Sequence, residues 1–187
     1  SFMNFSDVGG GICHQLMGEG NALPGEIIIG ADSHSVTLGA FGAFATGVGA
    51  TDMAAIWLTG ETWLRVPETI ALRLEGRFAG AAEAKDLALA YVGELGTDGA
   101  TYQALEFIGD AVKDLSIDER MVLSNLSVEA GAKAGLFYAD DVTVRYLRER
   151  GHTVRPQTPE SYTYSREQEF DLSDIIPLVA VPHRVDT

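Results

Sequence analysis

The chain has 187 residues, of which 46% are hydrophobic and 21% charged, and its net charge is −14 at pH 7. This composition excludes a disordered chain, and the apolar runs are strand-sized, too short to span a membrane. The acidic balance argues against binding to nucleic acids or anionic membranes, because a phosphate-binding face needs clustered Lys and Arg. The single cysteine excludes an internal disulfide framework and favours a cytoplasmic location.

Short apolar or β-branched runs predict strands, in chain order, at 26–30, 69–76, 104–109, 134–138, 169–172 and 177–182. Apolar residues at helical spacing predict helices that start near Thr51 and that cover about 84–95, 116–131 and 141–150. The helix from Ser116 begins with a capping box, in which Ser116 and Glu119 exchange hydrogen bonds with backbone amides. Alternating strands and helices predict an α/β fold with a mostly parallel sheet. The polar stretch 155–168 is interpreted as a surface connection.

The first predicted strand runs directly into Asp32, Ser33 and His34, and glycines follow. In open α/β sheets ligands bind beyond the carboxyl ends of strands, where these three residues stand. The alternative is a tight turn in which Asp32 and Ser33 only cap the next segment. A serine-protease triad is disfavoured, because adjacent side chains on an extended backbone point in opposite directions. The glycine pattern matches neither the dinucleotide-binding nor the P-loop motif.

Three further residues can take part in such a site. His14 follows a run of glycines, although a histidine beside apolar residues is more often structural. Asn125 and Glu129 lie four residues apart and therefore share a helix face, which is inert if it faces solvent. If that face meets a cleft, Glu129 can orient a histidine, and two carboxylate–histidine pairs suit proton handling or the orientation of water on a metal. Cys13 is expected to be a small buried hydrophobe.

Ordered motifs identify a resemblance to the aconitase superfamily. They are GICHQ (11–15), LPGEIIIGADSH (23–34), GAFGAFATGVGATDMA (39–54), KDL (85–87), GATYQALEF (99–107), SNLSVEAGAKAGLF (124–137) and DLSDIIPLVAVPH (171–183). Within the superfamily the chain resembles the family of large, catalytic subunits to which those of 3-isopropylmalate dehydratase and homoaconitase belong. The resemblance extends from about residue 7 to residue 183.

The resemblance implies a three-layer α/β/α sandwich of the aconitase N-terminal-domain type. It implies a hydro-lyase that isomerises 2-isopropylmalate and 3-isopropylmalate by dehydration and rehydration, in leucine biosynthesis. Homoaconitase or another 2-hydroxy-acid dehydratase is the alternative in the same class. A non-catalytic module that binds a carboxylic acid or a partner is the alternative in another. The implied roles are pairing of His14 with Asp32 and of His34 with Glu129 as catalytic residues, substrate contact by Ser33, and a place near the cluster for Asn125.

The resemblance further implies a [4Fe–4S] cluster with one iron that binds the substrate as a Lewis acid. The three cysteines that hold the cluster match positions beyond the last residue of this chain, and Cys13 matches none of them, so no metal ligand is expected in the chain. The catalytic serine base belongs to a swivelling domain in a separate small subunit, the expected partner. Ser35 stands where threonine is usual, and Ser124 where cysteine is common. We therefore expect residues 1–187 to be an internal segment of the large subunit, inactive alone and able to self-associate through exposed apolar surface.

Overall fold

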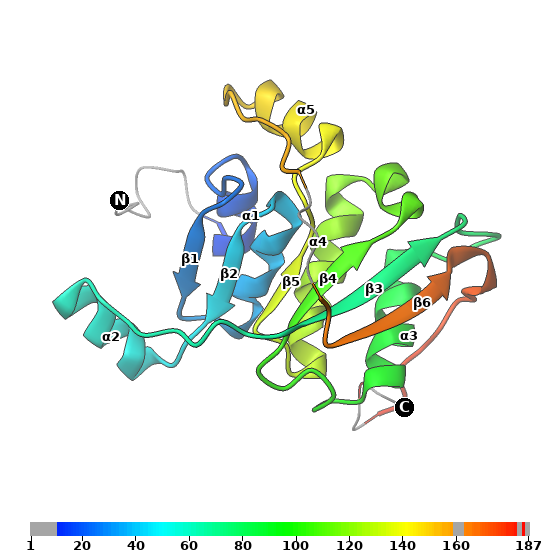
Figure 1. Cartoon of the computed structure of the whole chain (residues 1–187), viewed down its shortest axis with the longest axis horizontal. Coiled ribbons are helices and arrows are strands. Elements are labelled where there is room, and N and C mark those ends of the chain that lie inside the picture. Colours follow the sequence, from blue (N-terminus) through cyan, green and yellow to red (C-terminus); the bar gives the residue numbers. More distant parts are fainter. Residues whose placement is uncertain (1–10, 159–162, 183–184, 186–187) are drawn as a thin grey trace.

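Two parallel sheets form the framework of the chain, for which a computed structural model describes residues 11–158, 163–182 and 185 (Figure 1). The smaller sheet pairs β1 (Ile27–Gly30) with β2 (Phe44–Gly47). The larger sheet has the strand order β5 (Ala134–Leu136), β4 (Ala104–Ile108), β3 (Thr69–Glu75), β6 (Arg166–Asp171). All pairings between these strands are parallel, which confirms the predicted α/β class.

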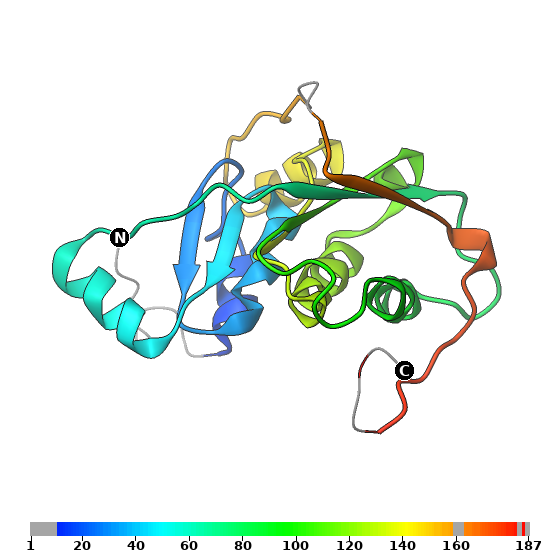
Figure 2. The same cartoon turned by 60° about the horizontal axis from the view of Figure 1, so that its bottom comes forward.

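The main core lies between the larger sheet and two helices, α3 (Ala84–Leu95) and α4 (Ile117–Leu126), which pack on the same side of it (Figure 2). Side chains of a strand point alternately to its two faces, so Ile70, Leu72 and Leu74 of β3 all point towards these helices. The remaining helices are α1 (Cys13–Gly18), α2 (Ala50–Thr59) and α5 (Asp141–Glu149), with 3-10 turns η3 (Asp110–Asp114), η4 (Ser127–Ala130) and η5 (Leu172–Asp174). Among the described helices, none has the length and apolarity needed to cross a bilayer.

A nine-residue 3-10 helix, η2 (Ser33–Phe41), connects β1 to β2 and is buried from Ser35 onwards. The backbone N–H of Phe137 donates to the carbonyl of Gly39 at 3.0 Å, which attaches η2 to the end of β5. A Cβ atom at Gly39 would lie 1.8 Å from the carbonyl oxygen of Gly135. The glycine is therefore required by close backbone contact, and this contact positions the polar residues at the start of η2.

The predicted helices are present with closely matching ends. The capping box of Ser116 and Glu119 is confirmed, and α3 ends before Gly96 as expected. The helix from Ser116 does not continue unchanged to residue 131, because it tightens into η4 at Ser127. The hydroxyl of Ser127 donates to the carbonyl of Ser124 at 2.6 Å. Tightening into 3-10 geometry is frequent in the last turn of a helix.

The observed strands differ from the predicted ones at three places. Residues 177–182 form no strand, since they leave the sheet after η5, and Val179 is 88% exposed. β2 was not predicted, because its four residues lie within the glycine-rich stretch. β6 starts at Arg166, inside the segment interpreted as a connection; only Phe170 in it is buried, so it has little apolar periodicity. Residues 155–158 of that segment have no regular structure, and 159–162 lie outside the described residues.

Candidate active site

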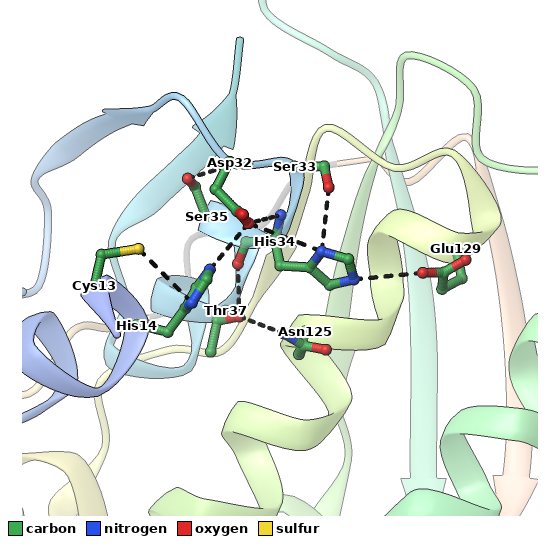
Figure 3. Close-up of polar contacts among 9 residues, drawn as sticks. All are labelled: Cys13, His14, Asp32, Ser33, His34, Ser35, Thr37, Asn125 and Glu129. Carbon is green, nitrogen blue, oxygen red and sulfur yellow. Dashed lines mark hydrogen bonds and ion pairs between the residues drawn. The ribbon is translucent and has the colours of Figure 1, made fainter. Parts of the chain in front are cut away.

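Asp32 lies beyond the carboxyl end of β1 and caps the N-terminus of η2 (Figure 3). Its Oδ1 accepts a hydrogen bond from the backbone N–H of His34 at 2.7 Å and lies 3.1 Å from Nε2 of His14. The pKa of Asp32 is lowered, first by the hydrogen bond from the His34 amide and then, against the opposing effect of burial, by the positive charge of His14. Asp32 is thus held as a carboxylate that can orient His14.

His34 lies between Ser33 and Glu129 (Figure 3). Its Nε2 is 3.4 Å from Oε1 of Glu129, and its Nδ1 is 3.1 Å from the hydroxyl of Ser33. One tautomer satisfies both contacts, because Nε2–H can donate to Glu129 while Nδ1 accepts from Ser33. A carboxylate in this position fixes the tautomer and the orientation of the ring, which suits His34 to exchange a proton with a ligand.

His14 is supplied by α1, and its side chain is 20% exposed. With Nε2 beside Asp32, the other ring nitrogen lies 3.7 Å from Sγ of Cys13. The expectation of a buried Cys13 is wrong, because this residue is exposed. It starts a six-residue helix in which only Gly18 is buried, so the first turn stays at the surface.

Asn125 and Glu129 both point towards η2 rather than into solvent (Figure 3). Nδ2 of Asn125 donates to Oγ1 of Thr37 at 2.9 Å, and that hydroxyl donates to the carbonyl of His34 at 2.6 Å. Thr37 was missed by sequence reasoning, and its only signal is the three-residue spacing from His34. Ser35 is also buried in η2, where its hydroxyl donates to the carbonyl of Asp32 at 2.7 Å. The face that carries Asn125 and Glu129 therefore contacts η2, which is the condition under which we expect Glu129 to orient a histidine.

The four residues His14, Asp32, His34 and Glu129 form one continuous row of acid–base groups, which we call the acid–base row. Their side chains are between 20% and 52% exposed, so a ligand can reach them. Two surface cavities, of about 670 and 450 Å³, share His14 as a lining residue. All six residues predicted for the site lie in or beside this row, although their catalytic roles remain a prediction.

The row is not a metal site by itself. In the part of the chain that the structure describes, no group of three or more His, Cys, Asp or Glu side chains is placed to hold a metal ion. Iron–sulfur clusters take cysteine thiolates, and Cys13 is the one cysteine in the sequence. The described residues of this chain therefore do not fit a cluster of their own.

The fold and the row together define an α/β protein equipped for acid–base chemistry on a small ligand at the carboxyl end of a parallel strand. A sequence model of the family described as Aconitase family (aconitate hydratase) matches residues 2–187. The chain belongs to the aconitase family.

The curated relatives carry names from two branches of that family. The chain is 50% identical over 186 residues to the 3-isopropylmalate dehydratase large subunit of Halothermothrix orenii, covering 96% of the chain and 44% of that protein. It is 49% identical over 191 residues to the probable methanogen homoaconitase large subunit of Methanosarcina mazei, covering 100% of the chain and 48% of that protein. The 3-isopropylmalate dehydratase large subunit of Elusimicrobium minutum is 47% identical to the chain over 184 residues, with 97% of the chain and 44% of that protein covered. The chain thus spans somewhat less than half the length of these relatives.

Proposed function

We propose that the chain forms part of the large subunit of a hydro-lyase that isomerises 2-isopropylmalate and 3-isopropylmalate by dehydration and rehydration, in leucine biosynthesis. The observation that carries this proposal is the acid–base row, in which two carboxylates each contact a histidine at 3.1 and 3.4 Å. Dehydration of a hydroxy acid removes a proton and a hydroxyl group, so it needs groups that accept and donate protons at fixed places. The relatives named 3-isopropylmalate dehydratase support the choice of substrate.

Each residue of the site has a definite task in this proposal. Glu129 and Ser33 hold the ring of His34 by its two nitrogens, Ser33 contacts the substrate, and the ring exchanges a proton with it. Asp32 holds His14 by Nε2 and so fixes the orientation of its ring. Asn125 fixes Thr37, which in turn fixes the backbone of His34. We also propose that Asn125 lies near the cluster of the complete enzyme.

The proposal includes groups from outside this chain. A [4Fe–4S] cluster, held by cysteines elsewhere in the complete enzyme, supplies a Lewis acid for the substrate hydroxyl when bound. The names "large subunit" of the relatives support a small subunit as the partner. The single cysteine of the chain favours a cytoplasmic location for this enzyme.

The test uses the complete reading frame with its small subunit, reconstituted anaerobically with iron and sulfide. We expect interconversion of 2- and 3-isopropylmalate, and a loss of about 10²–10⁴-fold in kcat for Glu129→Gln and Asp32→Asn, the contribution of a positioned acid or base. His152→Asn is the matched control, because His152 lies outside the row and should leave kcat unchanged. Full activity of both row variants would contradict the assigned roles, and absence of turnover on any hydroxy acid would contradict the function.

Homoaconitase is a second candidate, favoured by one specific observation. The relatives from Methanosarcina mazei and Methanothermobacter thermautotrophicus, both named probable methanogen homoaconitase large subunit, are 49% and 46% identical to the chain. These values are close to the identities of the isopropylmalate dehydratases, so identity alone does not choose the substrate. The ratio of kcat/KM for 2-isopropylmalate and homocitrate, measured with the same preparation, decides between them.

We further propose that residues 1–187 are a segment of the large subunit that packs against further domains. Large apolar side chains stand exposed on and after α2, with Trp57 at 67%, Leu58 at 87% and Trp63 at 82%. The isolated chain is therefore expected to self-associate in light scattering, to form no cluster and to show no turnover. Binding of a hydroxy acid by a complete protein that never turns it over would instead favour the non-catalytic module.

A further inference from the structure

A cavity of about 450 Å³ lies beside the acid–base row, between α1, η2, α3 and α4. His14, Thr37 and Asn125 line it together with Lys85, which comes from the first turn of α3. The site described so far does not use Lys85. Its position in the same cavity as three site residues raises the question of what its ammonium group binds.

Within the described residues, no hydrogen bond or ion pair engages the ammonium group of Lys85, which is exposed. The acidic neighbours Glu83 and Asp86 are occupied by backbone amides in the capping box of α3, and Asp86 also accepts from the N–H of Leu178. A cation in the first turn of a helix is disfavoured by the partial positive charge of the helix N-terminus. Local helix stability therefore does not explain Lys85.

The charge balance of the site points in the same direction. Asp32 and Glu129 place two carboxylates in the row, and these repel an anionic ligand unless a cation compensates them. Lys85 is the one lysine or arginine among the residues that line the two cavities meeting at His14. The two other lysines are engaged elsewhere, Lys113 with Asp110 and Lys133 5.4 Å from the ring centroid of Tyr102.

We propose that Lys85 and Asn125 form a carboxylate-binding subsite of the hydroxy-acid substrate. Asn125 gives one amide N–H to Thr37, and its second N–H has no acceptor among the described residues, so it can donate to a ligand in the cavity. The ammonium of Lys85 supplies a charge-assisted hydrogen bond and neutralises the anion. This subsite rests on the proposed function, because it places one end of the substrate next to His14 and His34.

Lysine acetylation of the complete enzyme, read by mass spectrometry, tests the subsite without any substitution. The probe is 2-isopropylmalate, and Lys113 and Lys133 are internal controls. Protection follows 1 + [L]/Kd, so at ten times the dissociation constant Lys85 should react about tenfold more slowly while the controls do not change. Unchanged reactivity of Lys85 under saturation would overturn the proposal.

Substitutions provide the second test. Lys85→Met should raise KM about tenfold or more with a smaller effect on kcat, because a charge-assisted hydrogen bond to the substrate is lost. Lys85→Arg should retain much of the affinity, and Lys113→Met is the control with unchanged KM. Lys85→Met should also keep or slightly raise Tm, since a cation leaves the helix N-terminus. If the Lys85→Met variant does not fold, the Lys85→Gln variant is measured in its place.

The two proposals fail separately. Turnover of 2-isopropylmalate with an unchanged KM in Lys85→Met keeps the function and removes the subsite. Protection of Lys85 by malate or 2-isopropylmalate, in an enzyme that turns over neither isopropylmalate nor homocitrate, keeps the subsite as a carboxylate site and removes the function.

Discussion

Two clusters of charged side chains, one centred on Arg120 of α4 and the other the acid–base row, are built in opposite ways. The first, which we call the buried arginine cluster, centres on Arg120, which is 0% exposed. Its guanidinium makes two bonds to Asp140, at 2.7 and 2.8 Å, and one to the carbonyl of Val112 at 2.8 Å. It also lies 5.5 Å from the ring centroid of Phe137. Asp140 in turn accepts from two backbone amides at the start of α5.

The acid–base row is partly open, and its hydrogen bonding is incomplete. Its contacts range from 3.1 to 3.8 Å, and its side chains remain 20% to 52% exposed. A cluster whose donors and acceptors are all paired is suited to fixing the positions of η3, α4 and α5. A row with free hydrogen-bonding capacity is suited to a ligand. The two clusters should therefore respond differently to the removal of a charge.

Arg120→Met should produce the largest change in stability. Removing one partner leaves the carboxylate of Asp140 uncompensated, and breaking a buried pair costs about 3–5 kcal/mol. Urea unfolding followed by circular dichroism measures this loss in the free energy of unfolding. A loss below about 1 kcal/mol, as for a surface ion pair, would remove the distinction between the two clusters.

The buried arginine cluster should also make the free energy of unfolding depend on pH. Burial raises the pKa of Asp140, but the hydrogen bonds and charge of Arg120 and the amides of α5 outweigh it, so the pKa is lowered overall. A carboxyl group whose pKa is lowered by folding stabilises the fold above its unfolded pKa, near 3.9, and this contribution disappears as pH falls through the folded value. The difference in unfolding free energy between the wild type and Asp140→Asn should thus be complete above about pH 5 and shrink below pH 4. A constant difference from pH 7 to pH 3 would contradict this linkage.

Ser124 lies on α4 between the two clusters, and its substitution should be stabilising. Its hydroxyl is buried without a hydrogen-bond partner among the described residues, a situation that costs about 1–3 kcal/mol. Ser124→Ala should therefore raise the free energy of unfolding by about 1 kcal/mol, and Ser124→Cys, which is close to serine in size, should also be tolerated. Thermal unfolding measures both. A clear loss for Ser124→Ala would show that the hydroxyl has a partner in solution.

Substitutions in the acid–base row should have the smallest effect on stability. Asp32→Asn keeps an oxygen that caps η2, and Glu129→Gln removes one partner of a solvent-accessible pair, so each should change the free energy of unfolding by less than about 1 kcal/mol. The same variants are expected to lose most of the activity of the complete enzyme. A loss of several kcal/mol in either variant would assign the row to stability instead of catalysis.

Local signals in the sequence determined much of this protein. The capping box at Ser116 and the glycine after α3 predicted helix ends correctly, because they act between neighbours along the chain. Strand-sized apolar runs predicted most strands, and the ordered motifs indicated which residues to examine. The start of the polar strand β6 was predicted too late and the apolar segment 177–182 was wrongly predicted as a strand, since strand formation depends on a partner that sequence periodicity does not reveal.

The family resemblance implied that His14 pairs with Asp32 and His34 with Glu129, and only the tertiary structure supplied the contacts themselves. The contact of His34 with Glu129, the bond of Asn125 to Thr37 and the burial of Arg120 all join segments distant in sequence. They depend on η2 packing against α4 and β5, which the close approach of Gly39 to Gly135 allows. Neighbouring residues specify helix ends and strand-sized runs, whereas the geometry of an active site follows from how those elements pack. The motifs therefore indicated the members of the site, and the fold determined its contacts.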